Sequence, residues 1–276
     1  MIGGMKCGTT ALWQYLRAHP HVFVPPSRKN LGFFDPRDNW HQGLDWYQEW
    51  FQGADQETQS VGEISTEYSK YPVSEGVAEN IAKTLPDAKL IYVVRHPIDR
   101  LVSQFVHMIN AGSERRDINV ALADFSNNPY VDTSRYGYQL SHYREHFARE
   151  SLLVIDAKEL LRAPQVALDK ISHFLGVPVW SPDAPVVAHT RDEKRNWNAL
   201  GRYIRRDPSR LNAYVYRMGK LPKPIASLVE RTLSKPIAPP VLSDERGREL
   251  RAVFREDVAL LREITGAEFD WQLDDG

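Results

Sequence analysis

Short apolar runs rich in β-branched residues predict the strands of a buried parallel sheet. The run "KLIYVV" at 89–94 is nearly continuous, as expected of a central strand covered on both faces. The run "SLLVID" at 151–156 has the same character, and "SVGEI" at 60–64 is a weaker candidate. These three segments are the strands that the pattern predicts with least ambiguity.

Between these runs, apolar side chains recur with the period of an amphipathic helix. The expected helices cover residues 9–18, 74–85, 97–110, 136–147 and 163–175. Strands separated by helix-length segments imply right-handed crossovers and a parallel sheet with helices on both sides. We therefore expect an α/β fold, with a central parallel β-sheet like that of P-loop proteins.

The strand signals stop after Trp180, and a polar loop followed by helices is expected from about residue 180. The last helix is expected at about 243–264, and the proline-rich stretch "ERTLSKPIAPP" is expected not to add a strand. No Gly/Ser linker or low-complexity run divides the 276 residues. One domain, 1–276, with a helical C-terminal part is the predicted organisation.

The charge balance of the chain argues against a protein that binds nucleic acid. Lys and Arg number 35 against 36 Asp and Glu, so no global field attracts nucleic acid. Residues 191–235 differ, because 12 Lys and Arg face only 4 Asp and Glu there. That excess indicates either a solvated basic surface or a surface that faces a polyanionic ligand.

The remaining composition bears on location. No apolar run approaches the length of a membrane span, and a single cysteine fits a reducing compartment, so a cytoplasmic location is expected. The glycine loop begins at residue 3, which leaves only Met1 and Ile2 for the strand that normally precedes such a loop. We expect that strand to be very short or cut. The oligomeric state stays open.

The stretch "IGGMKCGTTALWQYLRAHP" has the spacing of a P-loop with its lysine displaced. Gly3 and Gly8 keep the G-x-x-x-x-G spacing, but Thr9 stands where the lysine belongs, and Lys6 lies inside the loop. Glycines permit close approach of the backbone to a ligand, and the following helix start attracts anions. The pattern indicates a phosphate or sulfate site, with a glycine-rich helix start as the alternative.

A second informative stretch is "VVRHPIDRLVSQFVH", 93–107. Arg95 falls at the carboxyl end of the buried strand, where open α/β sheets bind ligands. On the following helix, Arg100, Ser103 and His107 share the face opposite the apolar arc. An arginine and a serine converging on a phosphate would explain this face, and an ordinary solvated face is the alternative.

Together the two stretches resemble motifs of the sulfotransferases that use 3′-phosphoadenosine 5′-phosphosulfate (PAPS). Their 5′-phosphosulfate loop is similar to "GGMKCGTTALWQYLRAHP", and their 3′-phosphate motif is similar to "RHPIDRLVSQF". The resemblance continues through "KNLGFFD", "GEISTEYSKYP", "RYGYQLSHYREHF", "ISHFLGVP" and "GAEFDWQ", nearly to the end of the chain. It is closest to the branch that includes heparan sulfate sulfotransferases and many bacterial relatives.

The resemblance implies a PAPS-dependent reaction with 3′-phosphoadenosine 5′-phosphate (PAP) as product and no metal ion. Lys6 is then implied to supply the cation at the bridging oxygen as the sulfuryl group departs, and Arg95 and Ser103 to bind the 3′-phosphate. The implied nucleotide-binding residues of the loop are Gly4, Met5, Lys6, Cys7, Gly8, Thr9 and Thr10. In the basic loop "HTRDEKRNW", the further candidates are Arg191, Lys194 and Arg195, with a solvated loop as the alternative.

The acceptor side departs from the family pattern. Relatives that sulfate glycans carry a glutamate base in a stretch like "KExxFF", where this chain reads "KNLGFF", and Asn30 cannot remove a proton. Glu63 is the first candidate base, with a structural hydrogen bond as its alternative. His107 and His41 follow, and Asp35 is expected to cap a turn. The aromatic segment 40–51 is expected to pack in the core, with an acceptor wall as the alternative.

Two functions from different classes stay open, and a third is weaker. The first is a sulfotransferase acting on an alcohol, phenol or sugar hydroxyl of a small-molecule, lipid or glycan acceptor. The second is a non-catalytic module that binds PAPS or PAP. The third is a nucleotide kinase, which the displaced lysine and the lack of an evident acidic pair for Mg²⁺ disfavour.

Overall fold

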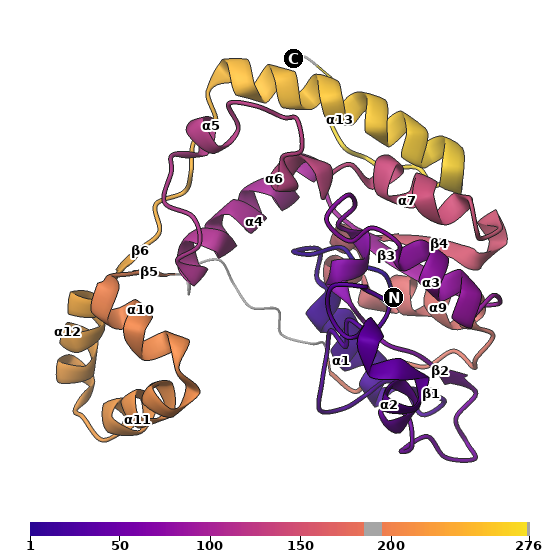
Figure 1. The fold of residues 1–276 in the computed structure, drawn as a ribbon, viewed down its shortest axis with the longest axis horizontal. Helices are drawn as coiled ribbons and strands as arrows, with labels where there is room; N and C mark the ends of the chain where they lie inside the picture. Colours follow the sequence, from indigo (N-terminus) through magenta and orange to yellow (C-terminus); the bar gives the residue numbers. More distant parts are fainter. Residues whose placement is uncertain (185–194, 275–276) are drawn as a thin grey trace. The chain divides into compact units, whose positions relative to one another are not determined.

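A computed structural model of the chain describes residues 1–184 and 195–274 (Figure 1). It contains two compact units, which we call the sheet unit and the helical unit. The sheet unit comprises 1–101, 124–188 and 244–276, and the helical unit 102–123 and 189–243. Helix α4 (Pro97–Ala111) begins in the first unit and continues into the second. This division does not test the prediction of one domain, which stays a prediction.

Parallel strands form the centre of the sheet unit. They are β1 (Val22–Phe23), β2 (Ser60–Val61), β3 (Leu90–Val94) and β4 (Leu152–Asp156). β1 pairs with β2, and β3 pairs with β4. Residues 1–4 join the two pairs: the N–H of Ser65 donates to the C=O of Met1 at 3.2 Å, and the N–H of Ile2 donates to the C=O of Ile91 at 3.0 Å. The spatial order is therefore β1, β2, residues 1–4, β3 and β4.

Burial separates the centre of this sheet from its edge. All five residues of β3 are buried, which confirms the central strand predicted from "KLIYVV". β4 forms where "SLLVID" predicts a strand, but most of its side chains are only half-buried. The difference follows from position, because β4 has one partner strand in the described sheet, whereas β3 has β4 on one side and residues 1–4 on the other.

Helices cover the faces of this sheet. They are α1 (Thr9–Ala18), α2 (Gly43–Glu49), α3 (Val77–Thr84), α6 (Pro129–Asp132), α7 (Tyr136–Arg144), α8 (Ala157–Arg162), α9 (Pro164–Leu175) and α13 (Asp244–Thr265), with 3-10 turns η1 (Trp40–Gln42), η2 (Thr66–Ser69) and η3 (Arg149–Ser151). The helical segments expected from the apolar period are all present, with ends shifted by a few residues. The α/β fold with a central parallel sheet is confirmed.

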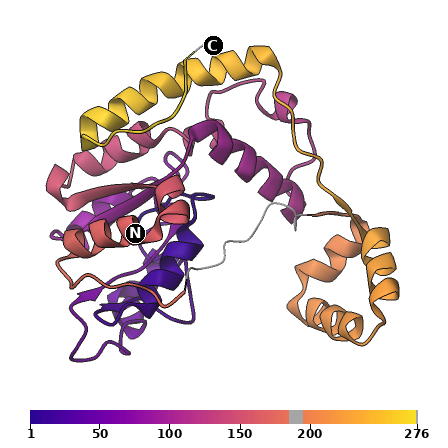
Figure 2. The same cartoon turned by 180° about the vertical axis from the view of Figure 1, so that it is seen from behind.

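The C-terminal helix α13 lies along α7, as both Figure 1 and Figure 2 show. The Asp257 carboxylate on α13 accepts hydrogen bonds from the backbone N–H groups of Gly137 and Tyr138, at 2.9 and 2.8 Å. A Cβ atom at Gly137 would overlap the backbone of Asp257, so only glycine permits this approach. Burial raises the pKa of Asp257 to about 6.

The helical unit corrects one expectation about the C-terminal part. It contains α5 (Ile118–Ala121), α10 (Ala199–Arg206), α11 (Pro208–Gly219) and α12 (Lys223–Leu233). It also contains two strands, although none was predicted after residue 180: β5 (Arg195–Trp197) pairs antiparallel with β6 (Ser234–Pro236). The proline-rich stretch does add a strand, because Pro236 ends a two-stranded ribbon whose edges tolerate a missing N–H. Within the described residues, no helix has the length and apolar character needed to cross a bilayer.

Candidate functional site

The glycine-rich loop connects the strand-like residues 1–4 to α1. Gly8 precedes α1 with a φ of 86°, and Lys6 has a φ of 67°, also in the left-handed region. A Cβ at Gly3 would overlap the hydroxyl of Ser69, and one at Gly4 would lie 3.1 Å from the Val93 carbonyl oxygen. The loop therefore lies tightly against the sheet. Helix α1 begins at the carboxyl edge of the sheet, and its N-cap residue, Gly8, has no side chain that could accept a hydrogen bond from the first N–H groups. Such a helix start offers unpaired N–H groups to an anion.

Lys29 is a residue at this loop that sequence reasoning missed. Its Nζ donates to the Oγ1 atoms of Thr9 at 2.9 Å and Thr10 at 3.1 Å. Burial, and then the positive charge of Lys6, lower the pKa of Lys29 to about 8. Two lysine charges and a helix N-terminus thus act on the same small volume, an arrangement that a bound anion would relieve.

A sequence signal for Lys29 existed but was weak. The lysine lies in the "KNLGFFD" segment, a few residues after β1. β1 has only two residues, and an apolar pattern of that length does not predict a strand. Without that strand, the sequence gives no reason to expect Lys29 beside the glycine loop.

Arg95 directly follows β3, as predicted. Its backbone is fixed by the buried Tyr136, whose hydroxyl accepts from the Arg95 N–H at 3.3 Å and donates to the Arg95 C=O at 2.8 Å. The guanidinium is 40% exposed and pairs with Asp99 at 3.2 Å. Exposed pairs of this kind contribute little free energy, so the arginine side chain can exchange Asp99 for a phosphate. Tyr136, which sequence reasoning did not single out, also contacts the Cys7 Sγ of the loop at 3.7 Å.

The polar face of α4 is divided between different roles. Arg100 is fully buried, and donates to the Ser134 hydroxyl at 2.7 Å and the Tyr130 carbonyl at 2.9 Å. This face is therefore not simply solvated at its start. Ser103 and His107 lie half-buried on the same helix, within the helical unit.

The basic loop is only partly described. Arg195 lies in β5, where its Nε donates to the Ser234 hydroxyl at 2.6 Å and its backbone N–H to the Asn110 side chain at 3.2 Å. Arg191 and Lys194 lie outside the described residues. The nucleotide-binding role of these three residues stays a prediction.

Glu63 is held in a buried network. Its carboxylate accepts from the Tyr68 hydroxyl at 2.5 Å and the Ser65 hydroxyl at 2.8 Å, and burial raises its pKa. These hydroxyls in turn accept from the backbone N–H groups of Phe34 and Gly32, at 3.1 and 3.0 Å. Glu63 thus orders the "KNLGFF" segment through the hydroxyls of Ser65 and Tyr68. This favours a structural hydrogen-bonding role for Glu63 over the role of general base.

Asn30 attaches the same segment to the chain after Glu63. Its N–H donates to the Ile64 carbonyl at 2.8 Å, and its side-chain oxygen accepts from the Thr66 N–H at 3.1 Å. Asp35 accepts from the Arg37 N–H at 2.9 Å, as a turn-capping residue does. His41 lies exposed on η1. Asn30 and Asp35 therefore make structural hydrogen bonds within and next to this segment.

The aromatic segment is partly buried: Tyr47 is buried, whereas Trp40 and Phe51 are half-buried. The rings of Phe33 and Tyr47 stack with centroids 4.3 Å apart, and Tyr47 meets Phe51 edge to face at 4.9 Å. Trp46 and Trp50 are half-buried. The ring contacts support core packing for Tyr47, and an acceptor wall stays open as the alternative for the half-buried rings. In the described parts of the chain, no group of three or more His, Cys, Asp or Glu side chains is arranged to hold a metal ion.

Comparison with known proteins gives three findings. The family model described as "Sulfotransferase domain" matches residues 1–194. The human bifunctional heparan sulfate N-deacetylase/N-sulfotransferase 2 is 30% identical over 220 residues, which cover 71% of this chain and 24% of that protein. The Caenorhabditis elegans N-deacetylase/N-sulfotransferase 1 is 28% identical over 192 residues, covering 64% and 22%. The chain spans about a quarter of the length of these relatives.

A solved structure shows the shared fold. The crystal structure of a sulfotransferase from Alicyclobacillus acidocaldarius superposes on 98% of this chain and 95% of its own, with a TM-score of 0.67 at 23% identity. The α/β architecture described above is therefore one that a known sulfotransferase adopts over its whole length.

Proposed function

Because this chain belongs to the sulfotransferase domain family, we propose that it moves the sulfuryl group of PAPS to a hydroxyl group of an acceptor. The observation that carries the proposal is the cationic cradle at the start of α1. There Lys29 donates to the hydroxyls of Thr9 and Thr10, and burial, followed by the charge of Lys6, lowers its pKa. A phosphosulfate would place negative charge beside these two lysines.

We propose roles for residues of the chain at the two ends of PAPS. PAPS supplies an activated sulfuryl group when bound. The N–H groups of the loop and of α1, with Thr9 and Thr10, would hold its 5′-phosphate. Arg95 and Ser103 would hold the 3′-phosphate, with Arg191, Lys194 and Arg195 as further nucleotide contacts.

Lys6 would act on the leaving oxygen. Charge accumulates on the bridging oxygen as the sulfur–oxygen bond breaks, and an ammonium held there stabilises that charge more in the transition state than in the ground state. The protein cation would therefore serve where a kinase uses Mg²⁺, and we propose that sulfuryl transfer here is in-line and independent of a metal ion.

The acceptor would be an alcohol, phenol or sugar hydroxyl of a small molecule, lipid or glycan. The curated relatives are named for N-sulfation of heparan sulfate, so an amine acceptor is the natural comparison in assays. Since Asn30 cannot accept a proton and Glu63 is committed to Ser65 and Tyr68, His107 and His41 are the candidate bases that follow. An acidic phenol would need little help from any base.

The decisive experiment is a calorimetric titration with PAP, ADP and ATP. Wild-type protein should bind PAP much more tightly than ADP, and Arg95→Ala should weaken PAP binding about tenfold or more, because a charge-assisted bond to phosphate is lost. Arg116→Ala is the matched control, since Arg116 is also an exposed arginine paired with a carboxylate, at 2.7 Å from Glu114.

The outcomes separate the competing functions. Equal affinity of the wild type for PAP and ADP would contradict the assignment, and a preference for ATP with phosphate transfer would indicate a kinase. Tight PAP binding without sulfate transfer to any alcohol, phenol, sugar or amine tested would indicate the non-catalytic module.

A further inference from the structure

Large apolar side chains lie exposed on two helices of the helical unit. On α10 they are Leu200 and Tyr203, 58% and 55% exposed, and on α12 they are Ile225 and Leu228, 47% and 65% exposed. Each pair has the i, i+3 spacing that places both side chains on one face of a helix. We call these two pairs the apolar stripes. Single exposed leucines need no explanation, but apolar side chains that gather on a face indicate a surface that meets a partner.

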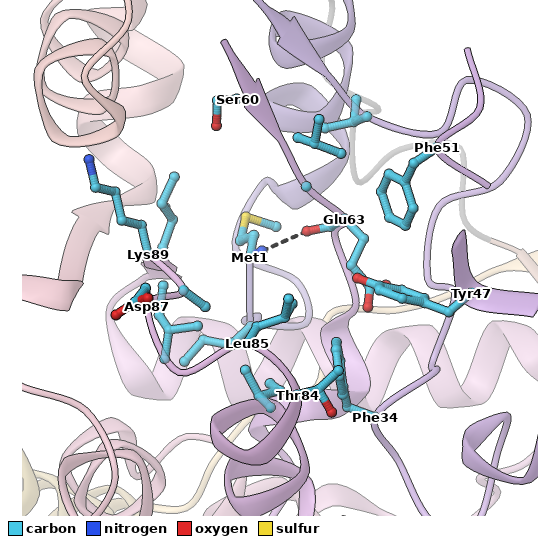
Figure 3. A pocket seen from close by; sticks show the side chains of 18 of the residues that line it. Met1, Phe34, Tyr47, Phe51, Ser60, Glu63, Thr84, Leu85, Asp87 and Lys89 are labelled. Carbon is cyan, nitrogen blue, oxygen red and sulfur yellow. Dashed lines mark hydrogen bonds between the residues drawn. The ribbon is translucent and has the colours of Figure 1, made fainter. Parts of the chain in front are cut away.

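The sheet unit shows no such stripes. Among its described side chains, no helix exposes more than one large apolar residue. Three of the exposed apolar side chains in that unit, Leu44, Val61 and Leu85, line a cavity of about 870 Å³ (Figure 3). The apolar stripes of α10 and α12 are therefore particular to the helical unit.

The same helices carry an excess of positive charge. Residues 199–233 include eight Lys and Arg but two Asp and Glu, whereas the whole chain has 35 against 36. Arg217 and Arg231 lie exposed in the last turns of α11 and α12. Basic and apolar groups adjoin, since the guanidinium carbon of Arg210 lies 4.0 Å from the centre of the Tyr203 ring. This combination favours a partner that is both anionic and apolar.

Asn198 fixes the start of α10 to the end of α12. Its N–H donates to the Leu233 carbonyl, and its side-chain amide donates to the Thr232 carbonyl, both at 2.9 Å. Its side-chain oxygen caps α10 by accepting from the Gly201 N–H at 2.9 Å. Figures 1 and 2 both show α10 and α12 as neighbours within one group of helices. A broad partner can therefore contact both helices.

A lipid bilayer with anionic headgroups meets both chemical requirements. A sulfated polysaccharide would pair with the basic side chains but would offer little apolar surface to leucines. A bilayer offers phosphates to Lys and Arg, and below them an apolar boundary for Leu, Ile and Tyr. Helices that separate apolar from basic positions, as α10 and α12 do, bind in the plane of the bilayer surface without crossing it.

We propose that α10, α11 and α12 form a surface that binds an anionic lipid bilayer. The apolar stripes enter the boundary between headgroups and acyl chains, and the basic side chains of the three helices contact lipid phosphates. The inference depends on the helical unit alone, so it stands or falls independently of the proposed sulfate transfer.

The test is flotation of the full chain with vesicles. Vesicles of equal amounts of phosphatidylcholine and phosphatidylglycerol should bind the chain at least about tenfold more tightly than vesicles of phosphatidylcholine alone, because each basic side chain gains from the anionic surface. Added salt should weaken that binding. Bound vesicles should slow amide hydrogen exchange in α10 and α12 and leave α9 unchanged.

Variants of the apolar stripes make the test specific. Leu200→Gln/Leu228→Gln should weaken vesicle binding about tenfold or more, because two side chains no longer enter an apolar phase. Val166→Gln/Val179→Gln is the matched control, since these valines of the sheet unit are 49% and 52% exposed. Leu200→Trp/Leu228→Trp should bind at least as tightly as the wild type, because tryptophan also favours the bilayer boundary.

Variants of the basic side chains test the contribution of charge. Arg217→Gln/Arg231→Gln should weaken binding to the mixed vesicles about tenfold or more, and should change binding to phosphatidylcholine little. Lys83→Gln/Lys170→Gln is the matched control, because both lysines are exposed in the sheet unit and pair with carboxylates.

Any of three results would overturn the proposal. The first is no preference for the anionic vesicles. The second is equal binding by the leucine and valine variants, because the apolar stripes would then not touch the bilayer. The third is tight binding of a heparin fragment, or a dimer in light scattering, by a chain that does not bind vesicles. Such a chain would use this surface for a polysaccharide or for a second copy of itself.

Discussion

At the scale of single residues, a variant of Lys6 distinguishes an effect on nucleotide binding from an effect on the rate of sulfate transfer. Lys6→Ala should lower the turnover rate about 100-fold, whereas PAP affinity should fall far less, because the charge acts mainly on the leaving oxygen. Stopped assays of sulfate transfer and calorimetry with PAP measure the two effects. Lys83→Ala is the control, since Lys83 is an exposed lysine that pairs with Glu79 at 2.6 Å. Wild-type turnover in the Lys6 variant would mean that Lys6 only anchors phosphate.

Lys29 predicts how PAP affinity depends on pH. Burial and the charge of Lys6 lower the pKa of Lys29 to about 8, and a bound anion would raise it. Below pH 8 the ammonium is present in both states and affinity is at its maximum. Above pH 8 binding requires proton uptake, so affinity should fall by about tenfold per pH unit until the pKa of the complex is reached.

Calorimetry in two buffers of different ionisation enthalpy measures that proton uptake. Lys29→Met should bind PAP more weakly and without a change near pH 8, while Lys83→Met should behave as the wild type. If the wild type takes up no proton between pH 8 and 9, Lys29 does not contact the bound nucleotide.

Glu63 and His107 give a paired test of the acceptor side. If His107 is the base, His107→Gln should lose about 100-fold in transfer to alcohols but retain more with acidic phenols, as expected when a base is removed. Glu63→Gln should instead lower activity with both acceptors and lower thermal stability, because it disturbs the bonds through Ser65 and Tyr68 that order Gly32 and Phe34. A stable Glu63→Gln protein that fails only with alcohols would restore Glu63 as the base.

At the scale of elements, the helices α10, α11 and α12 differ from those around the sheet. Among their described side chains, only Gly201 and Leu233 are buried. Leu200, Tyr203, Val215 and Leu228 are each more than half exposed. Helices whose described side chains bury so little surface gain little from packing, so we expect them to open at low free energy.

Amide hydrogen exchange should therefore be about 100-fold faster in α10–α12 than in α9, which buries Ala167, Leu168 and Ile171. Mass spectrometry of peptic fragments resolves the two regions in one sample, and PAP should slow exchange in the glycine loop. Equal protection in α10–α12 and α9 would show that another surface covers the exposed leucines.

At the scale of the whole molecule, the sequence predicted what depends on local pattern. The continuous apolar run of β3, the helix starts at Thr9 and Pro97, and Arg95 at a strand end are all local signals. These predictions are correct because strand burial and helical periodicity are both set by residues that are close together in the sequence.

The features that sequence reasoning missed depend on distant pairing. β5 and β6 form because residues 195 and 236 meet, and neither segment has a strand pattern of its own. Lys29 reaches Thr9 only through β1, which has two residues. Tyr136 fixes the Arg95 backbone across 41 residues of sequence. Such contacts are set by tertiary packing, which single-sequence periodicity does not encode.

The bond from Lys29 to the start of α1 has a consequence for the order of events in catalysis. Lys29 precedes Asn30 directly, and Asn30 is attached to Ile64 and Thr66 on the acceptor-side segment. A phosphosulfate that takes the place of the threonine hydroxyls would draw on Lys29 and, through it, on that segment. If the proposed function holds, we therefore expect an ordered reaction in which PAPS binds before the acceptor and PAP leaves last.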